Sequence, residues 1–325
     1  MIVVFVAALV SISSHFPGLL SYLDGTDSER NETSESIKEN TPSQPAEENS
    51  SSQENISIPN SDPNTETNTN NEINIEPNET ESQNNFTQAE EVNIETLKTE
   101  KFGWWYKPNS QHKTPEIPTE VAKMLDKFDA IYVGDTSRKV VYLTFDEGYE
   151  NGYTSSILDT LKENNVTASF FVTGSYIDKN PELVRRMVEE GHYVCSHTST
   201  HPSLPDLSDA QLEKEIKDLE EKFRSVTGRE IERYLRPPNG EYSEKSLYLT
   251  QKLGYVSVFW SLAYKDWDVN DQKGADYAYN FVTKNVHPGA VILLHAVSKS
   301  NAEALDRIIK GLINEGYTFE RLPKI

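Results

Sequence analysis

From Lys139 onward, runs of strand character alternate with runs of helical periodicity, and several helices end at a glycine that is followed at once by a new strand. Gly191-His192, Gly254-Tyr255 and Gly316-Tyr317 share this arrangement. Glycine tolerates the positive φ that commonly ends a helix. Strands that alternate with helices along a chain usually pair in parallel. The sequence therefore predicts an α/β fold, either an incomplete (β/α) barrel or an open doubly wound sheet.

We predict about seven strands and six helices in this region from the apolar periodicity. The clearest helix begins at the capping pair Ser208 and Gln211 and ends at Gly228. The first strand is followed by Asp146-Glu147-Gly148-Tyr149, which is not a glycine-rich phosphate loop. This favours a distorted or incomplete barrel over a nucleotide-binding sheet. The strands are expected at residues 139–145, 167–173, 192–197, 234–236, 255–262, 290–295 and 317–322.

The segment before this region has a different composition. Residues 24–97 contain 18 acidic and 2 basic side chains, which is most of the chain's net charge of −21. They are rich in Asn, Ser, Thr, Glu and Gln and hold too few apolar side chains to form a core, so we predict a disordered acidic spacer. The acidic balance argues against nucleic-acid binding. Nothing predicts a protein partner, and we expect a monomer.

Residues 1–23 contain no Asp, Glu, Lys or Arg, and their apolar run extends only from Ile2 to Val10. A membrane-spanning helix needs about 20 apolar residues, whereas the h-region of a signal peptide is shorter. We therefore predict a signal peptide or membrane anchor and an extracytoplasmic location, in the cell wall or on the membrane surface. The single cysteine, Cys195, excludes an intrachain disulfide and is expected to pack in the core.

Polar side chains follow the predicted strands at the points where the strands end. In a (β/α) barrel these ends share one face, where active sites are built. Neighbouring residues of an extended chain point to opposite faces, so one of two adjacent acids can bind a metal while the other stays free as a base. The residues at the strand ends are Asp146, Glu147, His197, His201, Arg236, Asp266, Trp267 and His295.

The spacing of His197 and His201 allows two imidazoles to hold one metal ion. Pro202 makes the preceding residue extended, so this is a strand-to-loop pair and not one face of a helix. Two histidines plus a carboxylate from another strand would suit Zn²⁺ or a similar divalent ion. The alternative to metal binding is that both histidines make only structural contacts. Trp260 and Trp267 also allow two interpretations: they line a sugar-binding groove, or they pack against the protein core.

Five short motifs resemble those of one family and occur in its order. Thr144–Gly148 (TFDEG) resembles the TFDDG motif of the polysaccharide deacetylases, the NodB-homology or family 4 carbohydrate esterases. Ser196–His201 resembles their H-[ST]-x-x-H motif, and Arg236–Gly240 resembles R-x-P-[YF]-G. Asp266-Trp267 resembles the end of D-x-x-D-W, and Leu293–His295 resembles L-x-H. The resemblance implies an incomplete (β/α) barrel.

Longer phrases resemble one branch of that family, the exported N-acetylmuramic acid deacetylases that modify spore-cortex peptidoglycan. Residues 139–325 are similar to the deacetylase domain, and residues 98–138, with the phrase FGWWYKPNSQHKTP, are similar to the branch's lead-in segment. The resemblance implies a hydrolase that removes acetyl groups from N-acetylmuramic acid, with peptidoglycan strands as its binding partner and muramic δ-lactam formation as its outcome.

The resemblance also implies a role for each site residue. Asp146 would be the general base, oriented by Arg236, and His295 the general acid, tuned by Asp266. A divalent metal ion, with zinc expected and cobalt or manganese as alternatives, would be held by Glu147, His197 and His201. The backbone N–H of Asn239 would stabilise the oxyanion, and Leu293 and Trp267 would shape the acetyl pocket.

Three positions depart from the family pattern. Glu147 replaces the usual metal-binding Asp, Asn239 replaces an aromatic residue, and Ala263 occupies the place of an acid. Two alternatives therefore stay open. The protein could deacetylate N-acetylglucosamine in peptidoglycan or chitin-type polymers, or it could be a wall-glycan-binding module whose turnover is impaired by Glu147.

Overall fold

The computed structural model describes residues 93–323, so the predicted leader at 1–23 and most of the predicted spacer at 24–97 lie outside the described residues. The strands are β1 (Phe102–Gly103), β2 (Val140–Glu147), β3 (Ser169–Val172), β4 (Tyr193–Ser196), β5 (Glu232–Leu235), β6 (Glu241–Tyr242), β7 (Val256–Ser257), β8 (Ala290–His295) and β9 (Thr318–Phe319). The helices are α1 (Thr119–Lys127), α2 (Thr154–Glu163), α3 (Gly174–Lys179), α4 (Pro181–Glu189), α5 (Asp209–Thr227), α6 (Glu244–Lys252), α7 (Ala275–Asn285) and α8 (Lys299–Asn314).

The main sheet is parallel and nearly closes on itself. Its strand order is β7-β5-β4-β3-β2-β8, and β9 pairs with the first residues of β2. Beyond β7 the chain reaches the opposite edge of the sheet, where Leu262 forms a parallel bridge with Ile292 of β8. The backbone N–H of Leu293 donates to the carbonyl of Leu262 at 2.9 Å. These contacts confirm the predicted incomplete (β/α) barrel.

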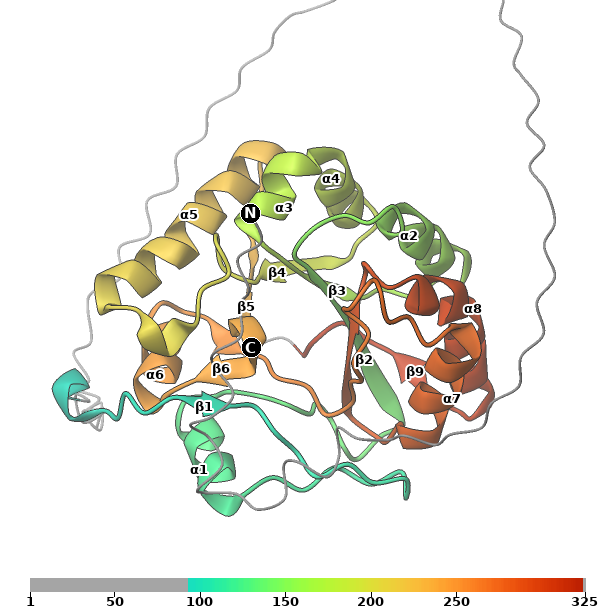
Figure 1. The fold of residues 1–325 in the computed structure, drawn as a ribbon, viewed down its shortest axis with the longest axis horizontal. Coiled ribbons are helices and arrows are strands. Elements are labelled where there is room, and N and C mark those ends of the chain that lie inside the picture. Colours follow the sequence, from blue (N-terminus) through green and yellow to red (C-terminus); the bar gives the residue numbers. More distant parts are fainter. Residues whose placement is uncertain (1–92, 324–325) are drawn as a thin grey trace, which may run out of the picture. The chain divides into compact units, whose positions relative to one another are not determined.

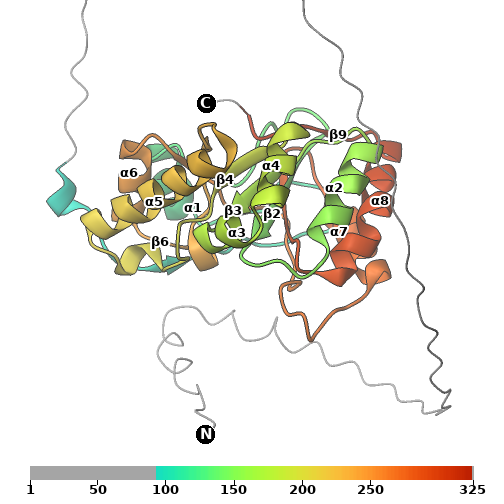
Figure 2. The ribbon, with the colours of Figure 1, turned by 90° about the horizontal axis from the view of Figure 1, so that it is seen from above.

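Alternation along each strand separates two apolar layers. In β2, Val141, Leu143 and Phe145 pack in the cluster that contains the buried side chains of the helices. Val140 and Tyr142 point the other way, into a cluster built from strand and loop residues that lines the concave side. Figures 1 and 2 show α5, α3, α4, α2 and α8 following one another around the outside of the strands. The helices therefore cover one face of the sheet and leave the concave face to the site.

The start and end of α5 agree with the capping residues predicted from the sequence. Ser208 and Gln211 form a capping box at the start of α5, and Gly228 ends this helix with a φ of 68°. Two helices were not predicted. The helix α3 is only six residues long, and the side chain of Thr173 caps its first turn. The helix α1 lies in the lead-in segment, where its single buried residue, Leu125, leaves little periodicity to detect.

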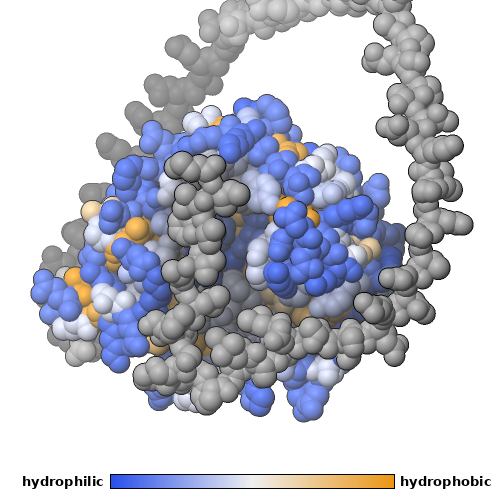
Figure 3. All heavy atoms as spheres, viewed as in Figure 1, coloured by the Kyte–Doolittle hydropathy of each residue, from blue (hydrophilic) through white to orange (hydrophobic). Residues whose placement is uncertain are grey.

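The structure also corrects two predicted boundaries. The strand expected at 255–262 is regular only over β7, because the chain then leaves β5 and crosses to β8. The predicted spacer extends to residue 97, yet Leu97 is buried among Leu125, Phe128 and other apolar side chains. Within residues 93–323 no helix has the length and hydrophobicity that a membrane crossing requires. Figure 3 shows mainly hydrophilic side chains over the visible described surface.

His192, at the start of β4, makes the stability of this fold sensitive to acid. Its Nδ1 accepts from the backbone N–H of Ala168 at 3.1 Å, while its Nε2 is buried without a partner among the described residues. Burial lowers the pKa of His192 from 6.5 to about 4. The folded protein thus binds fewer protons than the unfolded chain between these values, and the stability contribution is lost as the pH falls from 6.5 toward 4.

We expect His192→Gln to reduce this acid sensitivity, because glutamine keeps an acceptor for Ala168 but does not titrate. The wild type should lose on the order of 2–3 kcal/mol more than the variant between pH 7 and pH 4.5. Urea unfolding of both proteins across this range measures the difference. Parallel curves for the two proteins would contradict the assignment to His192.

Candidate active site

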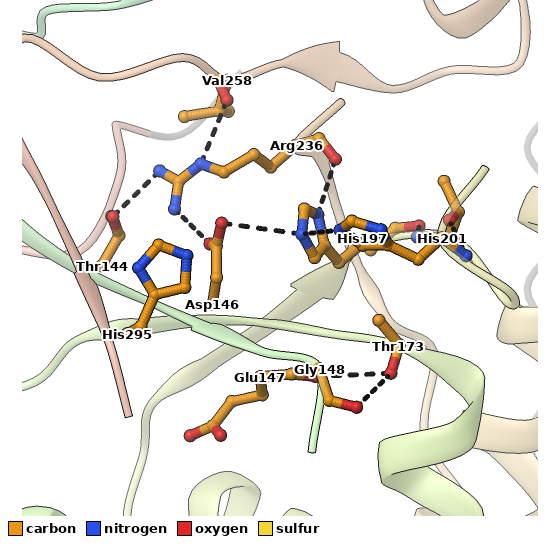
Figure 4. Close-up of polar contacts among 12 residues, drawn as sticks. Thr144, Asp146, Glu147, Gly148, Thr173, His197, His201, Arg236, Val258 and His295 are labelled. Atoms are coloured by element: carbon orange, nitrogen blue, oxygen red, sulfur yellow. Dashed lines mark hydrogen bonds and ion pairs between the residues drawn. The ribbon is translucent and has the colours of Figure 1, made fainter. Parts of the chain in front are cut away.

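Most of the predicted site residues lie together at the carboxyl ends of four strands, on the concave side of the sheet. Asp146 lies in β2, His197 follows β4, Arg236 follows β5, and His295 ends β8. Asp146 and His295 are register partners on adjacent parallel strands, so their side chains emerge side by side. Figure 4 shows Asp146 with Arg236, His197 and His295 around it. These four side chains therefore lie close together at one end of the sheet.

Arg236 holds Asp146 through a buried ion pair. Its Nη1 donates to Asp146 Oδ1 at 2.5 Å, and its side chain is fully buried. The other donors are also used, because Nη2 donates to Thr144 Oγ1 at 2.9 Å and Nε to the carbonyl of Val258 at 3.3 Å. The guanidinium carbon lies 4.1 Å from the centroid of Phe171. This arrangement fixes the carboxylate of Asp146 in one orientation.

The environment pushes the pKa values of Asp146 and His295 apart. Burial is the largest single influence on Asp146 and favours its neutral form, but the charges of Arg236, His197 and His295 and the Arg236 hydrogen bond together outweigh it and lower the pKa below 3.8. Burial also favours neutral His295, but the charge and hydrogen bond of Asp266 and the charge of Asp146 together outweigh it and raise the pKa above 6.5. At neutral pH, Asp146 is therefore ready to accept a proton, and His295 tends to keep one.

Asp266 fixes the tautomer of His295. The Nδ1–H of His295 donates to Asp266 Oδ1 at 2.7 Å, and the backbone N–H of His295 donates to Asp266 Oδ2 at 2.8 Å. The carboxylate is buried, whereas 23% of the His295 side chain is exposed. Because Nδ1 is occupied, Nε2 is the ring nitrogen left to exchange a proton with a substrate.

His197 and His201 converge through their Nε2 atoms, which lie 3.1 Å apart. The carbonyl of Arg236 lies 2.9 Å from His197 Nδ1, so that nitrogen carries the proton and the Nε2 lone pair is free. Burial lowers the pKa of His197 to about 4, which keeps the ring neutral near pH 7. Two neutral imidazoles with converging Nε2 atoms fit as ligands of one divalent ion.

Glu147 does not join this pair. It lies on the helix-facing side of β2 together with Phe145, and both of its carboxylate oxygens are 3.4 Å from Thr154 Oγ1 in α2. Figure 4 shows its carboxylate pointing away from His197 and His201. Across residues 93–323 no group of three or more His, Cys, Asp or Glu side chains is arranged to hold a metal ion. Strand alternation explains the result, since Asp146 and Glu147 must face opposite sides.

Because of this orientation, we expect Glu147→Gln to leave metal binding nearly unchanged. Burial raises the pKa of Glu147 well above 4.5, which favours the neutral acid, and an amide can replace that acid at similar size. His201→Ala should instead lose most of the affinity for Zn²⁺. Calorimetric titration of chelator-treated protein with Zn²⁺ compares the two variants. Equal losses in both would place Glu147 among the ligands.

The loops of the site hold strained backbone conformations. Thr198 and His201 have φ values of 65° and 63°, and Asn239 has 58°, so the extended conformation predicted for His201 from Pro202 is wrong. Residues other than glycine rarely adopt a positive φ, and such backbone strain concentrates at functional sites. Asn239 lies in the turn after Arg236, where the lead-in segment supports it through a 2.8 Å hydrogen bond from the N–H of Trp104 to the carbonyl of Gly240.

The remaining predicted residues differ in exposure. Trp267 is 53% exposed, and its ring lies 5.7 Å from that of His295, so it borders the site. Leu293 is buried on the concave side of β8, two residues before His295. Trp260 is partly buried and packs against the concave cluster. Cys195 is a free, buried cysteine in the same cluster, as predicted.

Two residues that orient side chains of the site were not identified from the sequence. Thr144 orients Arg236 and could have been suspected, because it is a polar residue two positions before Asp146 and therefore on the same face. Asn301 donates to Asp266 Oδ2 at 2.6 Å from the first turn of α8. No local pattern indicates this contact, because Asn301 is 35 residues from Asp266 in the chain.

Comparison with known proteins agrees with this site. The family model for polysaccharide deacetylase matches residues 133–258. The chain is 44% identical over 228 residues to the peptidoglycan-N-acetylmuramic acid deacetylase PdaA of Bacillus subtilis, covering 70% of this chain and 87% of that relative. It is 34% identical over 207 residues to a peptidoglycan-N-acetylglucosamine deacetylase of Bacillus cereus, covering 62% of this chain and 73% of that relative.

The similarity extends to three dimensions. The solved structure of B. subtilis PdaA, a family 4 carbohydrate esterase, matches with a TM-score of 0.68 and 44% identity, covering 69% of this chain and 96% of that structure. The fold and the site thus define a carbohydrate N-deacetylase. The chain belongs to the polysaccharide deacetylase family, the NodB-homology family of carbohydrate esterases.

Proposed function

We propose that the protein removes N-acetyl groups from N-acetylmuramic acid in peptidoglycan, the step that precedes muramic δ-lactam formation in spore cortex. The observation that carries the reaction type is the pairing of Asp146 with His295. They are adjacent across β2 and β8, and the environment holds one as a base and the other as an acid. The 44% identity to the B. subtilis muramic acid deacetylase supports the choice of sugar.

The chain's own residues divide the work of amide hydrolysis. Asp146 accepts a proton from the attacking water, and Arg236 keeps this carboxylate ionised and oriented. His295 donates a proton from Nε2 to the amide nitrogen, which must be protonated before the C–N bond breaks. The backbone N–H of Asn239 supports the developing oxyanion. A divalent ion held by His197 and His201, which we propose to be zinc, would polarise the acetyl carbonyl and lower the pKa of water.

We also propose that the protein is exported and acts at the cell wall. The charge-free, apolar start of the chain and the acidic segment at 24–97 support this location. Export would bring the domain to the glycan strands on which the proposed activity depends.

The second candidate function is a wall-glycan-binding module. The helix-facing orientation of Glu147 favours the binding module, because it leaves the two histidines without the acid that the family pattern supplies. The presence of Asp146, Arg236 and His295 in working geometry favours the enzyme.

One experiment separates these functions. The full chain is incubated with peptide-stripped glycan strands, with chelator or with added Zn²⁺, and the modified sugar is identified by mass spectrometry. We expect loss of acetyl from the muramic residue, abolished by chelator. Loss from glucosamine would keep the reaction and overturn the substrate. Glycan binding without acetyl loss under any metal would make the protein a binding module.

A further inference from the structure

Asp266 is held by an asparagine as well as by His295. Asn301 Nδ2 donates to Asp266 Oδ2 at 2.6 Å and to the carbonyl of His295 at 3.2 Å. The same carboxylate oxygen also accepts from the backbone N–H of His295. Both oxygens of Asp266 therefore accept hydrogen bonds, and Asn301 contacts both Asp266 and His295.

Tyr264 supports the orientation of the Asn301 amide. Its hydroxyl donates to Asn301 Oδ1 at 2.5 Å, so the oxygen of the amide faces Tyr264 and the nitrogen faces Asp266. A flipped amide would turn its oxygen toward the carboxylate of Asp266 and the carbonyl of His295, two groups that can only accept. Both side chains lie in the interior, with Asn301 1% and Tyr264 8% exposed. Buried polar groups in such a chain are costly to leave unpaired.

A second set of bonds ties the loop that carries Asp266 to the start of α8. Gln272 Nε2 donates to the carbonyl of Asp266 at 2.9 Å, and Gln272 Oε1 accepts from Ser298 Oγ at 2.7 Å. Ser298 caps α8 by accepting from the backbone N–H of Asn301. The first turn of α8 is thus anchored to the Asp266 loop through both its cap and Asn301.

We propose that Asn301, oriented by Tyr264, is a positioning residue that holds Asp266 as the acceptor for Nδ1–H of His295 and thereby aims His295 Nε2 at the substrate. The inference rests on the proposed function, because it assigns His295 the role of proton donor. Asn301 touches no substrate and acts through Asp266. The charged groups that act on His295 are Asp266 and Asp146, which favour its protonated form, and Arg236, which opposes it.

Asn301→Leu tests the inference by removing the amide at similar size. We expect kcat for deacetylation to fall about 10- to 100-fold with little change in KM, because the proton donor is misaligned while the glycan contacts remain. The basic limb of the rate profile should move to lower pH, because a displaced Asp266 no longer raises the pKa of His295 as strongly. Tyr264→Phe removes only the hydroxyl and should give a smaller change in the same direction.

Two variants serve as matched controls. Asn164 also donates its amide to a carboxylate, that of Asp306, at 3.0 Å, but this pair lies outside the site. The hydroxyl of Tyr255 also donates to an acid, Glu220, at 2.8 Å. Asn164→Leu and Tyr255→Phe should therefore leave kcat and the pH profile unchanged. Equal effects in a control and in its partner variant would indicate general destabilisation and overturn the inference.

Nitrogen-15 NMR of the His295 ring in chelator-treated full chain, assigned with His295→Gln, gives a readout that does not depend on turnover. At a pH above the pKa of His295, where the ring is neutral, we expect a fixed Nδ1–H tautomer in the wild type and a mixture of tautomers in Asn301→Leu. An unchanged His295 spectrum would overturn the inference even if kcat fell. If Asn301→Leu does not fold, the spectrum of Tyr264→Phe decides in the same way. A wild type without deacetylase activity would end the proposed function, and the spectra would still decide whether Asn301 positions the pair.

Discussion

Asp146→Asn is expected to lower kcat for deacetylation by about 10³-fold, because an amide cannot take the proton of the attacking water. The neighbouring Glu147→Gln change should leave kcat close to that of the wild type. The two acids are adjacent in sequence, but Asp146 faces His295 and Arg236 while Glu147 faces α2. The pair of variants therefore compares the same chemical change on the two faces of one strand.

The measurement is the initial rate of acetate release from peptide-stripped glycan strands, with folding checked by near-UV circular dichroism. Asp146→Asn should remain folded, because Arg236 keeps its bonds to Thr144 and to the carbonyl of Val258. Full activity in Asp146→Asn would remove this residue from the reaction. A large loss in Glu147→Gln would show that the helix-facing acid is needed after all.

Arg236→Met is expected to cost about 3–5 kcal/mol of folding free energy, because it leaves the buried carboxylate of Asp146 without its partner. The guanidinium is fully buried and its donors are satisfied by Asp146, Thr144 and the carbonyl of Val258. Without the charge of Arg236, the largest influence that opposes burial, the pKa of Asp146 should rise, so the acidic limb of the rate profile should move toward neutral pH. Urea unfolding measures the free energy of unfolding, and the pH dependence of kcat/KM measures the position of the acidic limb.

Arg233, in the strand β5 that precedes Arg236, provides the control. Its guanidinium forms an ion pair with Glu220, but 44% of its side chain is exposed. Arg233→Met should cost no more than about 1 kcal/mol, since exposed ion pairs contribute little. Combining Arg236→Met with Asp146→Leu should cost clearly less than the sum of the single changes, because the double variant leaves no buried charge unpaired. Additive costs would contradict a direct interaction between Arg236 and Asp146.

Much of the fold could be predicted because its signals are local. Strand and helix periodicity, the capping box at Ser208 and the glycine at position 228 each depend on neighbours a few residues away. The concentration of polar residues at strand ends predicted the position of the site, since parallel strands bring their carboxyl ends to one edge. The motif resemblance then assigned Asp146, Arg236 and His295 to roles that their geometry supports.

The orientation of Glu147 shows how a correct physical rule and a family pattern can disagree. Strand alternation places Asp146 and Glu147 on opposite faces, as the sequence already indicates. The family pattern nevertheless assigns the second acid to the metal. Its carboxylate lies instead against Thr154 of α2, on the side away from the histidines. The longer side chain of glutamate reaches farther into this helix-facing layer than an aspartate would.

The sequence by itself determined the α/β class and predicted the position of the site at the strand ends and the proposed acid–base residues, because each follows from periodicity or from short motifs. Only the tertiary structure decided the near-closure of the sheet through Leu262 and Ile292 and the contact of Asn301 with Asp266. It also decided that Trp104 of the lead-in segment supports the turn after Arg236. These contacts join residues far apart in the chain, and their partners are selected by packing, for which no local pattern exists.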